Sequence, residues 1–188
     1  MANEILREIN YKIIRQLRSV AAAGAGTWNS VPPPGVAEVW HRETLYYEFV
    51  RNSNFIFKAT QRVGGNWIVA GVNVCNVLET LNKFQPTSVP QGVAGIRKVG
   101  TIGEFTCYKD PTFPDDEWLM GHKGGNFLDT GFIYAPYLAL YSTGTIVLDD
   151  MVARKGMAQR SATKVVNANM YATGVMTSNT TSVNTHAV

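Results

Sequence analysis

The apolar positions at the start of the chain recur with the period of a helix. Between Ala2 and Val20, the residues Ile5, Ile9, Ile13 and Leu17 are spaced four positions apart, and basic side chains lie between them. Such spacing gives a helix one apolar side and one charged side. The pattern therefore predicts an amphipathic helix over residues 2–20.

A second helical pattern extends from Val36 to about Arg62. Asn52 to Asn54 have low helix propensity, so we expect a kink or a local break there. Gly64 and Gly65 follow the pattern and are typical of a helix end. The broad apolar face of this helix is predicted to consist of Val39, Tyr46, Phe49, Val50, Ser53 and Phe57.

The residues between these two helices have the composition of a linker. Ala21 to Gly35 contains small residues, glycines and then three consecutive prolines. Consecutive prolines favour an extended polyproline path. We therefore expect this segment to connect the helices without joining a sheet.

The middle of the chain combines short strand patterns with one further helix. Asn66 to Gly71 is apolar and predicts a buried strand, and Asn73 is a candidate N-cap for a helix over Val74 to Phe84. The remaining expected elements are a loop at Gln85–Gly95, paired strands at 98–102 and 104–108 around Gly103, a turn at 110–116 and a strand at 117–121.

Thr130 to Val147 is the longest aromatic and aliphatic run without a charged side chain. Its mixture of tyrosines, phenylalanine and branched residues favours a buried strand in the core. Pro136 cannot donate a backbone hydrogen bond, so we expect a bulge or a bend at that point. Beyond this run we expect a basic turn at Arg154–Arg160, a strand within Lys164–Met176 and a frayed polar end at Thr177–Val188.

Composition limits the possible classes of protein. The chain has 188 residues, 45% of them hydrophobic, which is enough for a globular core. A net charge of +3 and an isoelectric point near 8.9 are too mildly basic to indicate a dedicated nucleic-acid binder. Cys75 and Cys107 lack zinc-ligand spacing, and we expect two free buried thiols. Neither a signal peptide nor a membrane-spanning run is expected from the apolar pattern.

Candidate catalytic and metal-ligating residues are few and scattered. Asp149 and Asp150 are adjacent but have no acidic or histidine neighbours of the kind that a two-carboxylate site needs. His41, His122 and His186 belong to no recognisable Ser-His-acid arrangement. The glycine pairs fit neither the P-loop nor the dinucleotide fingerprint. We therefore expect no enzymatic activity, no metal and no cofactor.

Three segments occur in a set order: NWIVAGVNVCNVLETL at 66–81, CYKDPTFPDDEWLMGHKGG at 107–125 and TGFIYAPYLALY at 130–141. In order and spacing they resemble the major head proteins of T-even-like tailed phages. The third segment contains a Tyr, small residue, Pro, Tyr motif at Tyr134–Tyr137. The resemblance extends from Ala2 to about Met176 and includes no catalytic signature.

The resemblance implies an α+β tailed-phage capsid fold with a long spine helix, a peripheral β-sheet domain and an axial α/β domain. The implied divisions are 1–35 for the spine helix and linker, 36–129 for the axial domain, 130–176 for the peripheral strands and 177–188 for the tail. The family's N-terminal arm and extended loop are expected to be absent from this chain.

The function implied is that of a structural subunit of an icosahedral or prolate phage head. Copies would form pentamers and hexamers that enclose double-stranded DNA, in a virion assembled in the host cytoplasm. Scaffold, portal, vertex or decoration proteins are possible partners, and no membrane is involved. Two alternatives stay open, namely an encapsulin-like nanocompartment shell protein and a non-specific DNA-binding protein.

Basic side chains are the candidates for inter-subunit ion pairs or for a surface that faces packaged DNA. A solvated helix face would carry the same charges, and the sequence does not decide between these roles. DNA contacts of this kind would be directed at phosphates and sensitive to salt. The candidates are Arg7, Lys12, Arg15, Arg18, Arg154, Lys155, Arg160 and Lys164.

Overall fold

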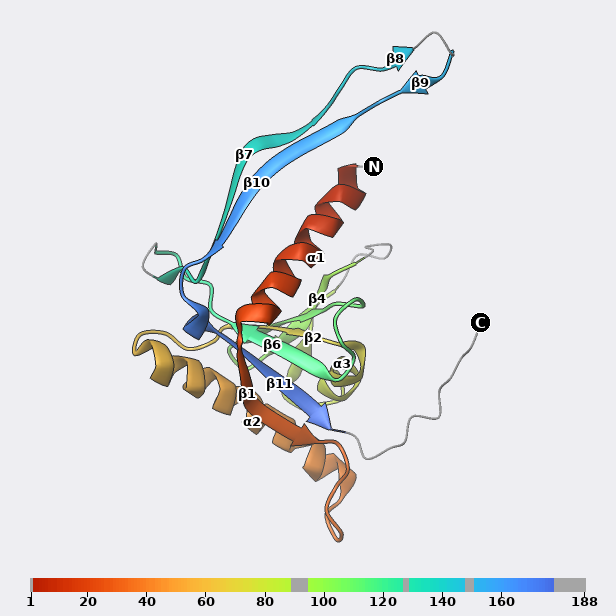
Figure 1. Cartoon of the computed structure of the whole chain (residues 1–188). Helices are drawn as coiled ribbons and strands as arrows, with labels where there is room; N and C mark the ends of the chain where they lie inside the picture. The colour runs from red at the N-terminus through yellow and green to blue at the C-terminus, as the bar shows by residue number, and fades with distance from the viewer. Residues whose placement is uncertain (1, 89–94, 127–128, 148–150, 178–188) are drawn as a thin grey trace.

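A computed structural model describes residues 2–88, 95–126, 129–147 and 151–177. Figure 1 shows the mixture of helices and strands, which confirms the predicted α+β class. The helices within these ranges are α1 (Ala2–Val20), α2 (Glu38–Thr60), α3 (Val72–Leu78) and a 3-10 helix at Ala168–Met170. The strands are β1 (Ala22–Asn29), β2 (Trp67–Ala70), β3 (Phe84–Pro86), β4 (Arg97–Ile102), β5 (Phe105–Lys109), β6 (Glu117–Gly121), β7 (Phe132–Ser142), β8 (Ile146–Val147), β9 (Ala153–Arg154), β10 (Met157–Val165) and β11 (Tyr171–Thr177).

Seven strands form one mixed sheet in the order β1-β11-β6-β2-β5-β4-β3. β1 is parallel to β11 and β2 is parallel to β5, whereas the other neighbours are antiparallel. The sheet thus takes strands from each of the segments 1–35, 36–129 and 130–176. The assignment of those segments to peripheral and axial domains stays a prediction.

The main core lies between one face of the sheet and the helices α2 and α3. Alternate residues of a strand face opposite sides of a sheet, and Trp118 and Met120 of β6 face the helices. The rings of Phe49 and Trp118 meet edge to face, with their centroids 5.6 Å apart. Other members of this core that solvent barely reaches are Leu45 and Ile56 of α2, Ile68 of β2, Val74 and Leu78 of α3, and Ile102 of β4.

A smaller core lies on the opposite face of the sheet, under α1. Leu17 is buried there with Phe113, Leu119, Met170 and Tyr171. Leu119 and Tyr171 come from β6 and β11, so the last turn of α1 covers the part of the sheet where these two strands pair. This contact anchors the C-terminal end of α1 to the body of the molecule.

The helices agree with the sequence in position and differ in detail. α1 has the predicted bounds, whereas the predicted break in α2 is wrong because that helix continues through Asn52. Phe49 faces the core as predicted, but Val39 and Phe57 are 63% and 54% exposed. Apolar residues occur on all sides of α2, so their spacing does not identify the buried side. The predicted cap at Asn73 is also wrong, because α3 follows Gly71 and ends at Leu78.

The predicted linker over Ala21–Gly35 is wrong in its first half. Ala22–Asn29 forms β1, whose Trp28 is buried and donates its Nε1 hydrogen to Thr44 Oγ1 at 2.8 Å. Glycine lets this strand pass close to α2, because a Cβ on Gly26 would lie 3.0 Å from Oδ1 of Asn52. The hydrogen-bonding partner is β11, near the other end of the sequence, and local composition carries no sign of it.

The prediction that Thr130–Val147 forms core is wrong. β7 pairs with β10 in a separate two-stranded ribbon, and Tyr137 and Tyr141 are 70% and 49% exposed. The predicted bulge at Pro136 is confirmed, since the register shifts between Arg160 and Ser161 of the opposite strand. A run without charges therefore forms a projecting hairpin in place of a buried strand.

The last predicted elements need two corrections. Arg154–Arg160 is not a turn, since it contains the end of β9 and the start of β10. The strand predicted within Lys164–Met176 is two strands, β10 and β11, separated by the 3-10 helix. The pairing of β4 with β5 around Gly103 is confirmed, and this glycine has a φ of +56° that suits its lack of a side chain.

Candidate assembly surface

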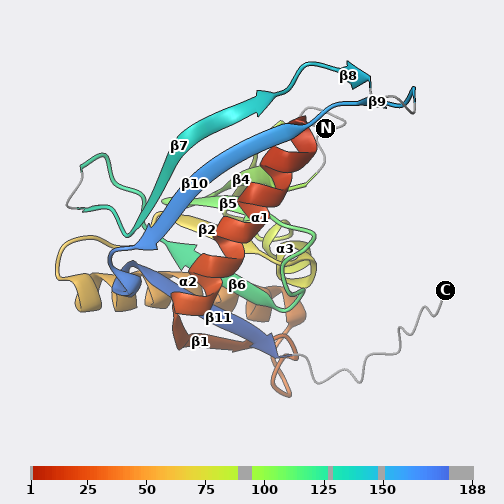
Figure 2. The ribbon, with the colours of Figure 1, turned by 45° about the horizontal axis from the view of Figure 1, so that its top comes forward.

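A long hairpin projects from the sheet beside α1 (Figure 2). β7 and β10 pair antiparallel from Phe132–Val165 at the base to Ser142–Met157, and β8 and β9 form a second short pair towards the tip. Figure 1 shows that the free end of α1 extends in the same direction. The hairpin and α1 are thus the two elements that reach farthest from the body at this end.

A cavity of ≈ 280 Å³ lies between the hairpin and α1. Ile5, Ile9 and Ile13 line it from the helix, and Tyr134 and Leu140 line it from β7. On β10 the lining residues are alternate ones, namely Met157, Gln159, Ser161 and Thr163. The apolar stripe of α1 is therefore only half covered towards its N-terminus, where these isoleucines remain partly accessible.

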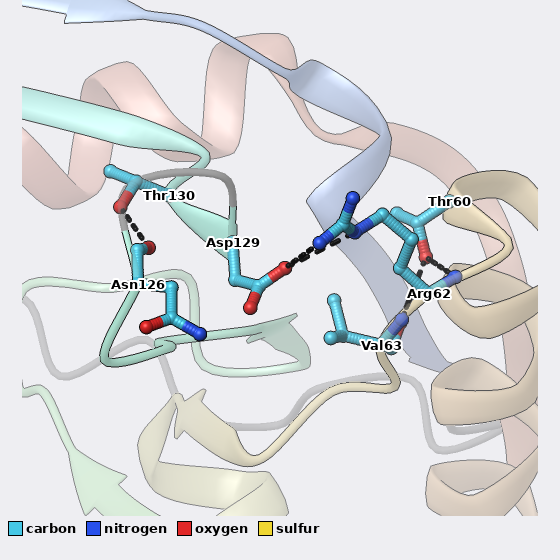
Figure 3. A network of polar contacts seen from close by, with 6 residues as sticks. All are labelled: Thr60, Arg62, Val63, Asn126, Asp129 and Thr130. Carbon is cyan, nitrogen blue, oxygen red and sulfur yellow. Dashed lines mark hydrogen bonds and ion pairs between the residues drawn. The ribbon is translucent and has the colours of Figure 1, made fainter.

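Polar contacts fix the base of the hairpin to the end of α2 (Figure 3). Arg62, just after α2, pairs with Asp129 at 3.2 Å, and the Asp129 amide donates to the Asn126 carbonyl at 3.1 Å. Thr60 Oγ1 donates to the Val63 carbonyl at 2.9 Å and so holds the turn that positions Arg62. These contacts set where the chain leaves the sheet and enters β7.

The outer part of the hairpin carries an apolar surface, which we call the tip surface: Ile146, Val147, Met151 and Val152. Their exposed fractions are 57%, 64%, 90% and 51%. Tyr137 and Tyr141 add aromatic surface nearer the base. Exposed apolar side chains at the end of a projecting element are typical of an interaction site.

The four basic candidates on α1 have different surroundings. Arg18 forms a bidentate pair with Glu117 at 2.7 and 2.9 Å and lies over the ring of Phe113. Arg7 pairs with Glu4 at 2.7 Å. Lys12 lines the cavity shared with the hairpin. Arg15 is exposed on the helix surface. Arg18 therefore has its ion-pair partner within the same chain, whereas Lys12 and Arg15 remain accessible to other molecules.

Two basic candidates of the hairpin, Arg160 and Lys164, lie on the side of β10 that faces away from α1. Since Gln159, Ser161 and Thr163 face α1, strand alternation directs Arg160 and Lys164 away from it. Arg154 ends β9, and Lys155 connects β9 to β10. The structure therefore does not bring the two basic groups together on one surface.

The other polar candidates have structural partners in the described part of the chain. His122 Nδ1 lies 2.7 Å from the Gly64 carbonyl, and His41 Nε2 lies 2.6 Å from the Asn29 carbonyl. Asp149, Asp150 and His186 are outside the described residues. Within the described ranges no group of three or more His, Cys, Asp or Glu side chains is arranged to hold a metal.

Both cysteines are free and buried, as predicted. Burial raises the pKa of the Cys75 thiol and of the Cys107 thiol to about 12. A thiol of this kind is protonated at neutral pH and is a poor nucleophile. In the described part of the chain, no helix is both long and apolar enough to cross a bilayer.

Sequence reasoning missed the tip surface and the cavity beside α1. The segment Ile146 to Val152 has apolar residues on both sides of its two aspartates, a pattern that is unusual for a turn. That pattern was the available signal for an exposed apolar tip. The cavity is formed by residues distant in sequence, so no local pattern indicates it.

Comparison with known proteins identifies the family to which the chain is similar. The family described as "Major capsid protein Gp23" matches residues 1–187. The major capsid protein of Enterobacteria phage T6 is 28% identical over 170 residues, covering 74% of this chain and 32% of that protein. For Enterobacteria phage T4 the identity is 27% over 167 residues, covering 74% and 31%. The chain thus spans about a third of the length of these relatives.

Solved structures give weaker likenesses. A structure from Mycobacterium phage Patience matches with a TM-score of 0.45 and 12% identity, covering 82% of this chain and 45% of that one. A structure from a prophage of E. coli CFT073 matches with a TM-score of 0.40 and 10% identity, covering 71% of this chain and 47% of that one. The family match over nearly the whole sequence confirms the resemblance to T-even-like head proteins. This chain belongs to the Gp23 major capsid protein family.

Proposed function

We propose that this chain is a structural subunit of a phage head and that its copies assemble into pentamers and hexamers around double-stranded DNA. The single observation that carries the proposal, beside the family, is the projecting hairpin with its exposed apolar tip surface. A two-stranded ribbon is marginally stable alone in water. Covering its apolar side chains with another copy would remove that surface from water and stabilise both.

The geometry favours a contact in which one copy uses a different surface from the copy that it meets. The hairpin lies at one end of the molecule, whereas α2 lies at the other (Figure 1). A contact between two different surfaces of identical chains is heterologous, and it closes a ring when the rotation between copies is suitable. Capsomers of five and six copies are such rings.

The proposed role is structural and includes no catalysis. The protein would reside in the virion capsid after assembly in the host cytoplasm. Scaffold, portal, vertex or decoration proteins would contact the shell that the copies form. Packaged DNA would meet basic side chains such as Arg160 and Lys164 through its phosphates, without sequence preference. A nanocompartment shell would differ in its cargo, which would be protein.

Assembly of the wild-type chain and of a tip-surface variant tests the proposal. We expect the wild type to form rings or shells in electron micrographs and the double variant Val147→Ser, Met151→Ser to remain monomeric by light scattering. Val166→Ser, which changes an exposed residue just after β10 at the base of the hairpin, is the matched control and should assemble normally. Monomers alone from the wild type under all assembly conditions, or normal assembly of the double variant, would contradict the proposal.

Charge reversal separates subunit contacts from DNA contacts. If Arg15 contacts another subunit, Arg15→Glu should reduce assembly and leave the DNA content per particle unchanged. If Arg160 faces DNA, Arg160→Glu should lower nucleic-acid retention without altering the yield of particles. If Arg15→Glu instead lowers nucleic-acid retention and Arg160→Glu reduces assembly, then Arg15 faces DNA and Arg160 contacts another subunit.

A further inference from the structure

Among the described residues, α1 covers only part of the width of its side of the sheet. Leu17 packs on β6 and β11, whereas the sheet continues through β2, β5 and β4. Between α1 and these three strands lies an open cavity of ≈ 540 Å³. That volume is within the range of sites that bind ligands or peptide side chains.

The cavity exposes surface that such a sheet normally buries. Parallel neighbours such as β2 and β5 are usually covered on both faces. On the helical side Ile68 is fully buried, but Trp67 and Val69 line the cavity on the α1 side and Trp67 is partly accessible. Ile13 and Ile14 of α1 form the facing wall. An apolar side chain from another molecule would be covered by the sheet on one side and by α1 on the other, and so would be removed from water.

Gly95, two residues before β4, lies against the N-terminal half of α1. A Cβ on Gly95 would lie 2.9 Å from Arg7 Cδ and 3.2 Å from the Tyr11 hydroxyl. The segment leading into β4 therefore touches α1 two to three helical turns from Leu17. The cavity is open to solvent and lies along α1 between the contact at Leu17 and the contact at Gly95.

Two lysines give the cavity its charge. Of the residues that the structure describes, Lys98 of β4 and Lys123 after β6 line it, and no aspartate or glutamate does. Neither ammonium has an ion-pair partner among the described residues. By contrast, Lys109, on the other face of β5, pairs with Glu79 at 3.1 Å. The positive charge of the cavity is therefore not neutralised by the described part of the chain.

We propose that this cavity binds a peptide segment of another protein chain that carries an apolar side chain beside one or two carboxylates. The apolar side chain would lie against Trp67 and Ile13, which are partly accessible. The carboxylates would pair with Lys98 and Lys123. A nucleic acid fits this surface less well, because its phosphates would engage the lysines and leave the apolar walls uncovered. The proposal goes beyond shell assembly and does not depend on the hairpin.

Two pools of short peptides test the proposal with the full 188-residue chain. In the acidic pool, acetylated and amidated hexapeptides alternate Asp or Glu with Leu, Ile, Phe or Trp, and in the neutral pool Asn and Gln replace the acids. Equilibrium dialysis followed by mass spectrometry measures retention of each pool. We expect acidic peptides to be retained at least fivefold more than neutral ones, with the difference decreasing as salt rises.

The double variant Lys98→Met, Lys123→Met identifies the site, because methionine keeps most of the unbranched apolar stem of lysine and removes the charge. It should lose at least tenfold in affinity for the best acidic peptide, whereas Lys58→Met, on the exposed surface of α2, should bind like the wild type. An unchanged melting temperature shows that the variant is folded. Equal retention of the two pools, unchanged binding by the double variant, or tighter binding of a duplex oligonucleotide to the same lysines would each overturn the proposal.

Discussion

The guanidinium of Arg18 on α1 meets the carboxylate of Glu117 at the start of β6 in a bidentate pair, with N···O distances of 2.7 and 2.9 Å. The same guanidinium lies 5.7 Å from the centroid of the Phe113 ring. One side chain thus ties the last turn of α1 both to a central strand and to the loop before it. The pair sets the direction in which α1 leaves the body.

Loss of this pair should weaken the docking of α1. Because the side chains of Arg18 and Glu117 are 42% and 24% exposed, solvent screens their attraction. We expect Arg18→Met to lower the free energy of unfolding by about 1 kcal/mol, measured by urea denaturation. Arg15→Met is the matched control on the same helix and should change it by less than about 0.5 kcal/mol. Equal effects of the two changes would mean that the pair contributes nothing specific.

Close packing makes Gly174 of β11 intolerant of any side chain. A Cβ at this position would lie 2.2 Å from two carbons of the Trp118 indole, which is fully buried. Neither the ring nor the adjacent strand can move far in a filled core. We expect Gly174→Ala to destabilise the fold by about 3 kcal/mol, seen as a lower melting temperature.

The control for this change is Gly144→Ala. Nothing lies within 4 Å of a Cβ built on Gly144, between β7 and β8. The added methyl group should therefore leave the melting temperature within about 2 °C of the wild type. A Gly174→Ala protein as stable as the Gly144→Ala protein would show that β11 does not pack on the indole as described.

Local sequence patterns predicted the elements that form from residues close together in the sequence. The four-residue spacing of Ile5 to Leu17 gave α1 its bounds, and the turn at Gly103 gave the β4–β5 pair. β1 was missed because its strand conformation depends on hydrogen bonds to β11, and a run of alanines and glycines has no strand signal of its own. Its only anchor with a large side chain is Trp28.

The hairpin shows why composition failed to identify burial. Tyr134 is partly buried and its hydroxyl accepts a hydrogen bond from Gln159 Nε2 at 2.6 Å, whereas Tyr137, three residues on, is 70% exposed. Both belong to the same uncharged run. Apolar residues serve equally well in a core and in a surface that another chain covers, so the sequence does not separate the two. The basic candidates are ambiguous for the same reason.

The buried thiols give the protein a defined loss of stability at high pH. In the unfolded chain a cysteine titrates near pH 9.0, whereas burial raises the pKa of Cys75 and of Cys107 to about 12. Between these values the unfolded state binds fewer protons than the folded state, so stability falls as pH rises. Below pH 9 the contribution is fully present.

Denaturation in urea as a function of pH measures this effect. Each thiol should lower the free energy of unfolding by about 1.4 kcal/mol per pH unit above pH 9. Cys107→Ala should reduce that slope, although the smaller side chain also costs stability at every pH. Slopes that are identical in the wild type and in this variant would contradict protonated burial of the Cys107 thiol.

Asn52 is a buried polar residue whose amide lacks hydrogen-bonding partners within the described ranges. It is fully buried in the middle of α2, and neither atom of its amide has a hydrogen-bonding partner among the described residues. Gly26 of β1 lies directly over it, as a Cβ there would be 3.0 Å from Oδ1 of Asn52 and 3.1 Å from Oε2 of Glu48. A buried amide without partners costs free energy that an apolar side chain of similar volume does not.

We therefore expect Asn52→Leu to raise the free energy of unfolding by about 1–2 kcal/mol, measured by urea denaturation at neutral pH. Asn54→Leu is the control, because Asn54 is exposed on the same helix and its replacement should have little effect. If Asn52→Leu instead lowers stability by a similar amount, the amide must have a partner in solution that bridges α2 and β1. The sign of the change therefore decides whether β1 packs on α2 at Gly26 through van der Waals contact alone or through a polar bridge at Asn52.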